Sequence, residues 1–172
     1  MLNEFGGWAI EKACFDFIRS FASEGSSVIE LGSGYSTKAL SQYYRVTSIE
    51  HDSDFLHKHQ NEFSQGKFSV ELILAPLVKI PSGGVWYDPT KVAAKLPHFS
   101  RLVLVDGPPA IFGREGLLEH LPLFQNTDAF IFDDVNRPSE FLLLSQVASA
   151  LNKKFDVIKG RKKEFGVILL NP

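Results

Sequence analysis

Two glycines one residue apart, placed between two short apolar runs, constrain the fold of this chain more than any other feature. The first run, 28–31, leads into Gly32 and Gly34, a helix is predicted from Ser36, and the second run ends in Glu50. Glycine permits a sharp turn and the close approach of a ligand to the backbone. A carboxylate at the end of the second strand can accept both hydroxyls of a ribose. The segment therefore predicts a strand, loop, helix and strand that hold an adenosine.

Details of the loop decide between adenosine cofactors. A dinucleotide fold needs a third glycine where this chain has Thr37, and no Gly-Lys-Ser/Thr sequence for a phosphate-binding loop is present. The stretch Glu30-Leu31-Gly32-Ser33-Gly34 resembles motif I of the class I S-adenosylmethionine (SAM) dependent methyltransferases. The alternative is a tight turn after a buried strand that binds nothing.

This resemblance implies a role for each residue near the loop. Glu30 would interact with the amino-acid end of SAM, and Glu50 would hold the ribose hydroxyls. His51 and Asp52 would lie beside the adenine. The cofactor-binding residues implied in this way are Glu30, Gly32, Ser33, Gly34, Ser36, Thr37, Glu50, His51 and Asp106.

Composition limits the classes of protein that remain. A chain of 172 residues, 44% of them hydrophobic, fits one domain with an ample core, 1–172. The net charge of -2 excludes a global polycation, so nucleic acid is predicted to be an unlikely partner. No apolar run is long enough to cross a membrane, and the first residues lack the basic start of a signal peptide. We therefore expect a cytoplasmic protein with no membrane partner. Its oligomeric state stays open, with a homodimer as one option.

The remaining pattern alternates between helices and strands. A helix is expected over about 7–23, another after Asp52 as its N-cap, and others over 113–123 and 138–151, with Pro138 in the first turn of the last. An irregular insertion is expected over about 75–100, with a short strand at 85–87. Two runs, 155–159 and 165–170, are joined so tightly that they must be antiparallel. By resemblance to the methyltransferases, the fold is a doubly wound α/β, Rossmann-like sheet of seven strands. Its order would be 3-2-1-4-5-7-6, and its last strand pair would be the antiparallel hairpin.

Acidic residues follow two continuous apolar runs in the second half of the chain. Asp106 follows 102–105, and the pair Asp133 and Asp134 follows 129–132. Buried parallel strands end at one edge of the sheet, where ligands bind. We therefore expect these carboxylates to converge. Asp106 is the first candidate for a catalytic base, since a protonated hydroxyl is a poor nucleophile.

Two kinds of positive partner could balance the converging carboxylates. The acid pattern is similar to the magnesium site of catechol-type O-methyltransferases, which makes Asp106, Asp133 and Asp134 weak metal candidates. Alternatively Arg114 and Arg137 supply the charge and bind an acidic group of the acceptor. The second option is preferred, so no metal is assigned, and magnesium is kept as the alternative cofactor.

The predicted residue roles follow from these options. The catalytic candidates are Asp106, Asp133 and Arg137, and the substrate-binding candidates are Arg114, Asp134 and Arg137. The stretch 161–163, Arg-Lys-Lys, is expected to be a solvated turn.

The resemblance leads to a function. The predicted activity is SAM-dependent methyl transfer to an oxygen of a small acidic metabolite or sugar. Two alternatives remain open: a non-catalytic SAM-binding or regulatory subunit with the same fold, and transfer of an aminopropyl group from decarboxylated SAM.

Overall fold

A computed structural model describes residues 5–6 and 9–171 of the chain. Its helices, 3-10 turns (η) and strands are, in chain order, α1 (Lys12–Phe21), β1 (Ser27–Leu31), α2 (Tyr35–Leu40), β2 (Arg45–Glu50), α3 (Ser53–Phe63), β3 (Val70–Leu74), β4 (Leu77–Lys79), β5 (Val85–Tyr87), α4 (Pro89–Ala93), β6 (Leu102–Val105), η1 (Ala110–Phe112), α5 (Leu117–His120), η2 (Leu121–Phe124), β7 (Ala129–Phe132), α6 (Pro138–Ala150), β8 (Asp156–Lys159) and β9 (Glu164–Leu169).

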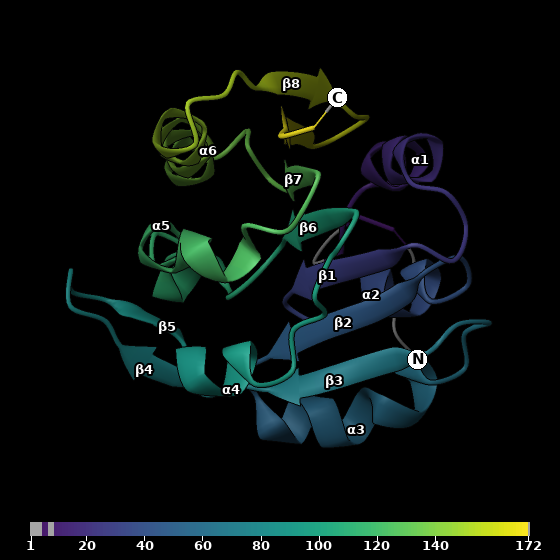
Figure 1. Ribbon diagram of the computed structural model, residues 1–172. Coiled ribbons are helices and arrows are strands. Elements are labelled where there is room, and N and C mark those ends of the chain that lie inside the picture. The colour runs from purple at the N-terminus through teal and green to yellow at the C-terminus, as the bar shows by residue number, and fades with distance from the viewer. Residues whose placement is uncertain (1–4, 7–8, 172) are drawn as a thin grey trace.

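Seven of these strands form one sheet in the order β3-β2-β1-β6-β7-β9-β8 (Figure 1). Neighbours from β3 to β7 run parallel, whereas β9 is antiparallel to both β7 and β8. The predicted order 3-2-1-4-5-7-6 is confirmed, because β4 and β5 pair only with each other and shift the numbering. The chain therefore has the Rossmann-like fold of the methyltransferases, closed by the expected hairpin.

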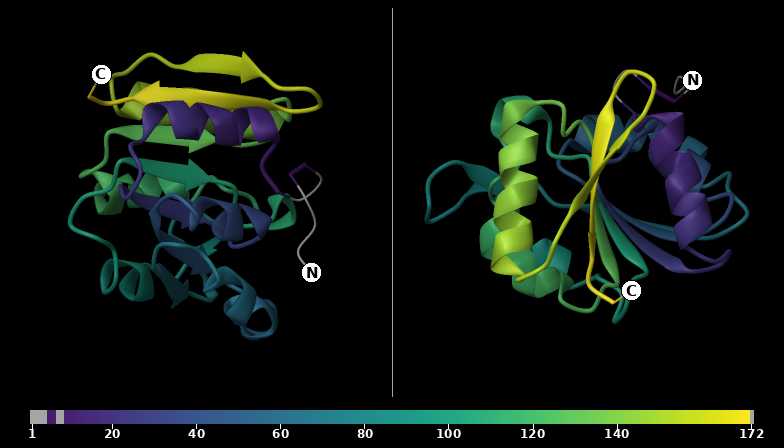
Figure 2. Two further views of the ribbon diagram at one scale, coloured as in Figure 1. Left: turned by 90° about the vertical axis from the view of Figure 1, so that its right-hand side faces the viewer. Right: turned by 90° about the horizontal axis from the view of Figure 1, so that it is seen from above.

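The central strands are apolar on both faces because helices cover both. Along β6, Leu102 and Leu104 belong to one hydrophobic cluster and Val103 and Val105 to the other. Ile18 of α1 packs into the first cluster and Leu144 of α6 into the second. Figure 2 shows α1 and α6 on opposite sides of the sheet. This layering directs the loops after β1, β2, β6 and β7 to the same carboxyl edge.

Three predicted boundaries differ from the structure. The first helix begins at Lys12, not near Gly7, and Gly7 and Trp8 lie outside the described residues. The helix expected over 113–123 is confined to the single turn of α5, because Pro122 lacks the amide hydrogen that would continue it. The 75–100 insertion contains the predicted strand 85–87 and also β4, which forms a hairpin with it. Among the described residues, no helix is long and apolar enough to cross a membrane.

Candidate functional site

Gly32 lies where two loops of the carboxyl edge touch. Its φ of +90° is in the region that favours glycine. A Cβ on Gly32 would lie 3.1 Å from Gly107 Cα and 3.2 Å from the Asp106 carbonyl oxygen. A Cβ on Gly107 would lie 2.7 Å from Gly32 Cα. The loops after β1 and β6 thus cross at a distance that requires glycine on both sides.

Gly34 is different, since its surroundings are open. Its φ of 179° is extended backbone, and a Cβ there would meet no atom within 4 Å. Its amide donates to Thr37 Oγ1 at 2.9 Å and fixes the start of α2. The first and second glycines of the motif therefore have separate tasks: Gly32 permits the crossing, and Gly34 leaves space beside the loop.

Glu30 is buried in β1, and its carboxylate supports the glycine loop through hydrogen bonds. Its carboxylate accepts hydrogen bonds from Ser36 Oγ and Thr37 Oγ1, both at 2.5 Å, and from Ser48 Oγ at 2.8 Å. Burial raises the pKa of Glu30 to about 7, against the opposing effect of the three hydroxyl donors. Glu30 therefore joins β1, β2 and the first turn of α2, and its predicted contact with SAM stays a prediction.

Replacing Glu30 by glutamine should change how stability depends on pH. The folded pKa of about 7 exceeds the ordinary 4.5, so folding takes up a proton. The contribution of Glu30 is thus fully present below about pH 4.5 and is lost as the pH rises through about 7. Glu30→Gln stays neutral throughout. The free energy of unfolding of the wild type, minus that of the variant, should therefore fall over this interval in urea titrations. If the difference in free energy of unfolding between the two proteins did not change with pH, the raised pKa of Glu30 would be contradicted.

The carboxylate of Glu50 is hydrogen-bonded to the loops after β1 and β2. One carboxylate oxygen accepts from Ser33 N at 3.1 Å and Ser33 Oγ at 2.6 Å, and the other from the amides of His51 at 2.7 Å and Asp52 at 2.9 Å. A carboxylate offers about four lone-pair sites. A ribose hydroxyl bound here would therefore replace the hydroxyl of Ser33. Asp52 caps α3, as expected, by accepting from two of its amides.

Asp106, Asp133 and Asp134 converge at the ends of β6 and β7, as predicted. One oxygen from each lies within 4.8 Å of the others. Asp134 has a φ of 60°, a conformation that costs free energy and is concentrated at functional sites. Burial, followed by the charge of Asp133, holds the pKa of Asp106 well above its usual range. A carboxylate with a raised pKa is a stronger proton acceptor, which suits the predicted role of Asp106 as a base.

The cation closest to these acids is Lys163, and the prediction that 161–163 is a solvated turn is wrong for it. Lys163 Nζ lies 2.8 Å from Asp133 Oδ2, 3.0 Å from Asp134 Oδ1 and 3.0 Å from the Ala9 carbonyl oxygen. Burial alone would lower the pKa of Lys163, but the two carboxylates raise it. A divalent ion would share two of its three carboxylates with this ammonium, so the set does not fit magnesium well.

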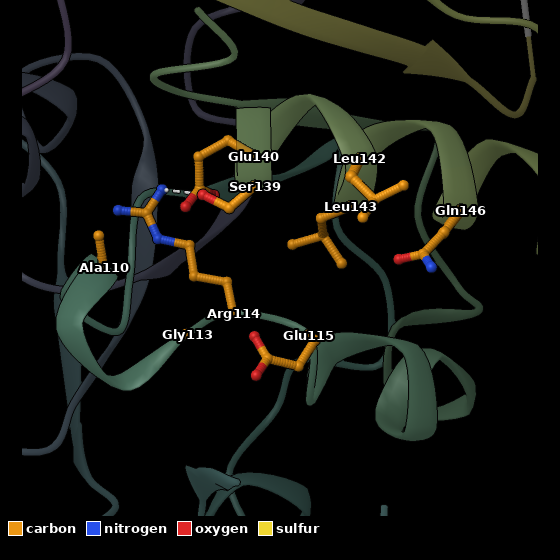
Figure 3. Close-up of a pocket in the computed structure, with 9 residues that line it drawn as sticks. All are labelled: Ala110, Gly113, Arg114, Glu115, Ser139, Glu140, Leu142, Leu143 and Gln146. Atoms are coloured by element: carbon orange, nitrogen blue, oxygen red, sulfur yellow. Dashed lines mark hydrogen bonds and ion pairs between the residues drawn. The ribbon is translucent and has the colours of Figure 1, made fainter. Parts of the chain in front are cut away.

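The two predicted arginines are placed differently from each other. Arg137 is partly exposed and lies 2.9 Å from Asp134. Arg114 is buried, donates to the carbonyl oxygens of Asp106 at 2.7 Å and Pro108 at 3.0 Å, and pairs with Glu140 at 3.4 Å (Figure 3). Arg114 thus holds the loop after β6 in place. No sequence pattern indicated Glu140, which lies in the first turn of α6.

A cavity of about 320 Å³ lies next to Arg114, between the η1 and α5 segment and α6 (Figure 3). Its walls include Gly113, Glu140, Leu142 and Gln146, and none of its lining residues belongs to the glycine loop. The cavity and the glycine loop are therefore separate features. Arg114 lines the cavity and also holds the loop after β6, which crosses the glycine loop.

Comparisons with known proteins support the fold. No family model and no curated protein matches the sequence. A methyltransferase from Pyrococcus furiosus is similar in structure, with a TM-score of 0.65 and 14% identity over 94% of this chain and 83% of that chain. A protein from Streptococcus pneumoniae, assigned as a tRNA (m1A22) methyltransferase and solved with SAM, has a TM-score of 0.53 and 16% identity over 92% and 71%. TrmK from M. capricolum, solved with S-adenosylhomocysteine (SAH), has a TM-score of 0.56 and 13% identity over 91% and 66%.

These neighbours contradict one prediction. Nucleic acid was predicted to be an unlikely partner from the net charge of -2. The fold similarity includes the S. pneumoniae protein assigned to tRNA methylation, so that prediction is wrong. The physical reason is that a net charge averages over the whole surface, whereas recognition depends on the potential at one edge.

Proposed function

We propose that this protein is a SAM-dependent methyltransferase that holds its cofactor on the loop around Gly32 and Gly34. The observation that carries the proposal is the open space at Gly34, where a Cβ would meet no atom within 4 Å, next to the loop residue Ser33 that binds the carboxylate of Glu50. A glycine that leaves space beside its backbone is typical of a loop that follows a ligand. The shared methyltransferase fold agrees with this assignment.

Each part of the edge has a task in such a reaction. SAM supplies a methyl group that its positive sulfonium makes electrophilic. Glu50 would accept hydrogen bonds from the ribose, and Gly34 would let the cofactor lie against the backbone. Asp106 would receive the proton of the acceptor at a carboxylate oxygen. Alignment and exclusion of water would supply most of the rate.

Balance of the acidic cluster by Lys163, Arg114 and Arg137 favours a reaction without a metal. Lys163 contacts Asp133 and Asp134, Arg137 contacts Asp134, and Arg114 contacts Asp106 at 3.5 Å. Activity is therefore expected to be the same with and without EDTA. If EDTA abolished the activity and magnesium restored it, a metal site like that of the catechol-type enzymes would be supported instead.

Two classes of molecule are candidates for the methyl acceptor. A base in RNA is suggested by the S. pneumoniae fold neighbour that is assigned to tRNA methylation. An oxygen of a small acidic metabolite or sugar is the class that the sequence suggested, and the exposed side of Arg137 could pair with its charge. Incubation with labelled SAM, followed by separate counting of RNA and small molecules, distinguishes the two.

Calorimetric titration with SAH tests the proposed function. The wild type should bind with micromolar affinity. Glu50→Ala should weaken binding by roughly 1.5 to 3 kcal/mol, about ten- to more than a hundredfold, because it removes a charged acceptor for two hydroxyls. Ser33→Ala removes only the hydroxyl that donates to Glu50. This control should bind SAH at least as tightly as the wild type.

The outcomes separate the roles of Glu50. If Ser33→Ala and Glu50→Ala weakened SAH equally, Glu50 would act only by holding its loop. If the wild type did not bind SAH, the proposal would fail. Binding of SAH without transfer to RNA or to any small molecule would instead favour the non-catalytic SAM-binding subunit, and transfer from decarboxylated SAM would favour the aminopropyl alternative.

A further inference from the structure

The hydroxyl of Tyr87 is a buried polar group without a hydrogen-bond partner in the described part of the chain. Tyr87 is 0% exposed and ends β5, in the insertion that the sequence predicted to be irregular. Leaving a buried hydroxyl unpaired costs free energy, so native structures seldom do so without a functional reason. Tyr44, also 0% exposed, shows the usual arrangement: its hydroxyl lies 3.3 Å from the carbonyl oxygens of Ile18 and Ala22.

The unpaired hydroxyl points to the crossing of the two glycine loops. A Cβ on Gly107 would lie 2.4 Å from Tyr87 Oη, and that same Cβ would lie 2.7 Å from Gly32 Cα. The ring of His51, which follows Glu50, is 6.5 Å from the ring of Tyr87 in an edge-on arrangement. The hydroxyl therefore lies beside the backbone that the proposed function assigns to the cofactor. Because it is closed off from solvent, a ligand oxygen reaches it only when this crossing opens.

Burial, followed by the charge of Glu50, holds the pKa of Tyr87 well above its usual value. The phenol therefore stays protonated and can donate a hydrogen bond. A ribose hydroxyl both donates and accepts, whereas Glu50 as a carboxylate can only accept. A ribose bound to Glu50 thus needs a donor for its own oxygens. The hydroxyl of Tyr87 is a buried donor at this crossing, and its hydrogen bonds no other described residue.

We propose that Tyr87 is a ribose-binding residue of the cofactor site, and that its Oη donates a hydrogen bond to a ribose hydroxyl oxygen whose hydrogen is accepted by Glu50. This inference rests on the proposed function. It assigns the β4–β5 hairpin to recognition of the nucleoside.

The test compares Tyr87→Phe with the matched variant Tyr44→Phe by thermal unfolding and by calorimetry with two probes. SAH contains the nucleoside and an amino-acid end, and 5′-methylthioadenosine contains the same nucleoside without that end. Tyr87→Phe should weaken both probes by the same factor, roughly three- to tenfold. Without ligand its melting temperature should be unchanged or about 2 to 4 °C higher, since no internal hydrogen bond is lost.

Tyr44→Phe should do the opposite, with a melting temperature about 2 to 4 °C lower and unchanged affinity for both probes. Loss of SAH affinity alone in Tyr87→Phe would place the hydroxyl at the amino-acid end and overturn the ribose assignment. Unchanged affinity for both probes, or a melting temperature lowered as in Tyr44→Phe, would overturn the inference while leaving the proposed function intact. A wild type that binds neither probe would overturn both.

Discussion

Replacement of Lys163 by methionine is expected to lower the free energy of unfolding by about 3 kcal/mol near pH 7, because it removes one partner of a buried ion pair. Methionine keeps most of the aliphatic volume but not the ammonium, which lies 2.8 Å from Asp133 Oδ2. Asp133 is 0% exposed, and its other oxygen has no partner among the described residues. Urea denaturation at several pH values measures the effect.

The dependence of this loss on pH has a definite sign. Burial already raises the pKa of Asp133, and removal of Lys163 should raise it further. A carboxyl with a raised folded pKa stabilises the fold below its unfolded pKa and loses that contribution as the pH rises. The deficit of Lys163→Met should therefore shrink in acid. Lys162→Met, at an exposed position of the same turn, should stay within about 0.5 kcal/mol of the wild type. Equal losses in the two variants would mean that the buried pair does not stabilise the fold.

Gly34→Val is expected to abolish detectable SAH binding, with an affinity lower by more than about a hundredfold, while the protein stays folded. The backbone at Gly34 is extended, and its missing Cβ faces no atom within 4 Å, so valine fits the free protein. The added side chain would fill the space proposed for the cofactor. Stability should fall by about 1 kcal/mol or less, because valine is a poorer N-cap than glycine but keeps the amide that donates to Thr37. Calorimetry and urea denaturation measure the two quantities.

Gly32→Val provides the contrast. At a φ of +90°, and with a Cβ 3.1 Å from Gly107 Cα, valine should cost about 2 to 4 kcal/mol of stability before any ligand is added. The two glycines of one motif would then differ in kind, one required by the fold and the other by the ligand. If Gly34→Val bound SAH as tightly as the wild type does, the assignment of the cofactor to this loop would be wrong.

Most of the sheet could be predicted because local signals agreed with one another. The apolar runs of β6 and β7, each followed by aspartate, are typical of buried parallel strands that end at a ligand edge. Asp52 capped α3 and Pro138 began α6 where expected. The convergence of three aspartates followed from the topology, since strands that end at one edge bring distant residues together.

The residues that the sequence did not indicate depend on contacts between distant segments. A lysine in a basic turn gives no sign that the turn folds over two aspartates, so Lys163 was assigned to solvent. Tyr87 lies among prolines and glycines that obscured its hairpin. Arg114 was recognised as part of the edge, but whether it faces a substrate or its own loop depends on side-chain packing. Periodicity describes neighbours along the chain and not such partners.

The turn between β8 and β9 links the last hairpin of the sheet to the segment before α1. Glu11, just before α1, accepts hydrogen bonds from the amides of Lys162 and Lys163, and Lys163 also donates to the Ala9 carbonyl oxygen. During synthesis the strands that carry the aspartates leave the ribosome before this turn does, and domains fold as units. The acidic edge therefore gains its buried counter-charge only after β8 and the turn that follows it have been translated. Assembly of a charge-balanced site thus waits for the antiparallel hairpin.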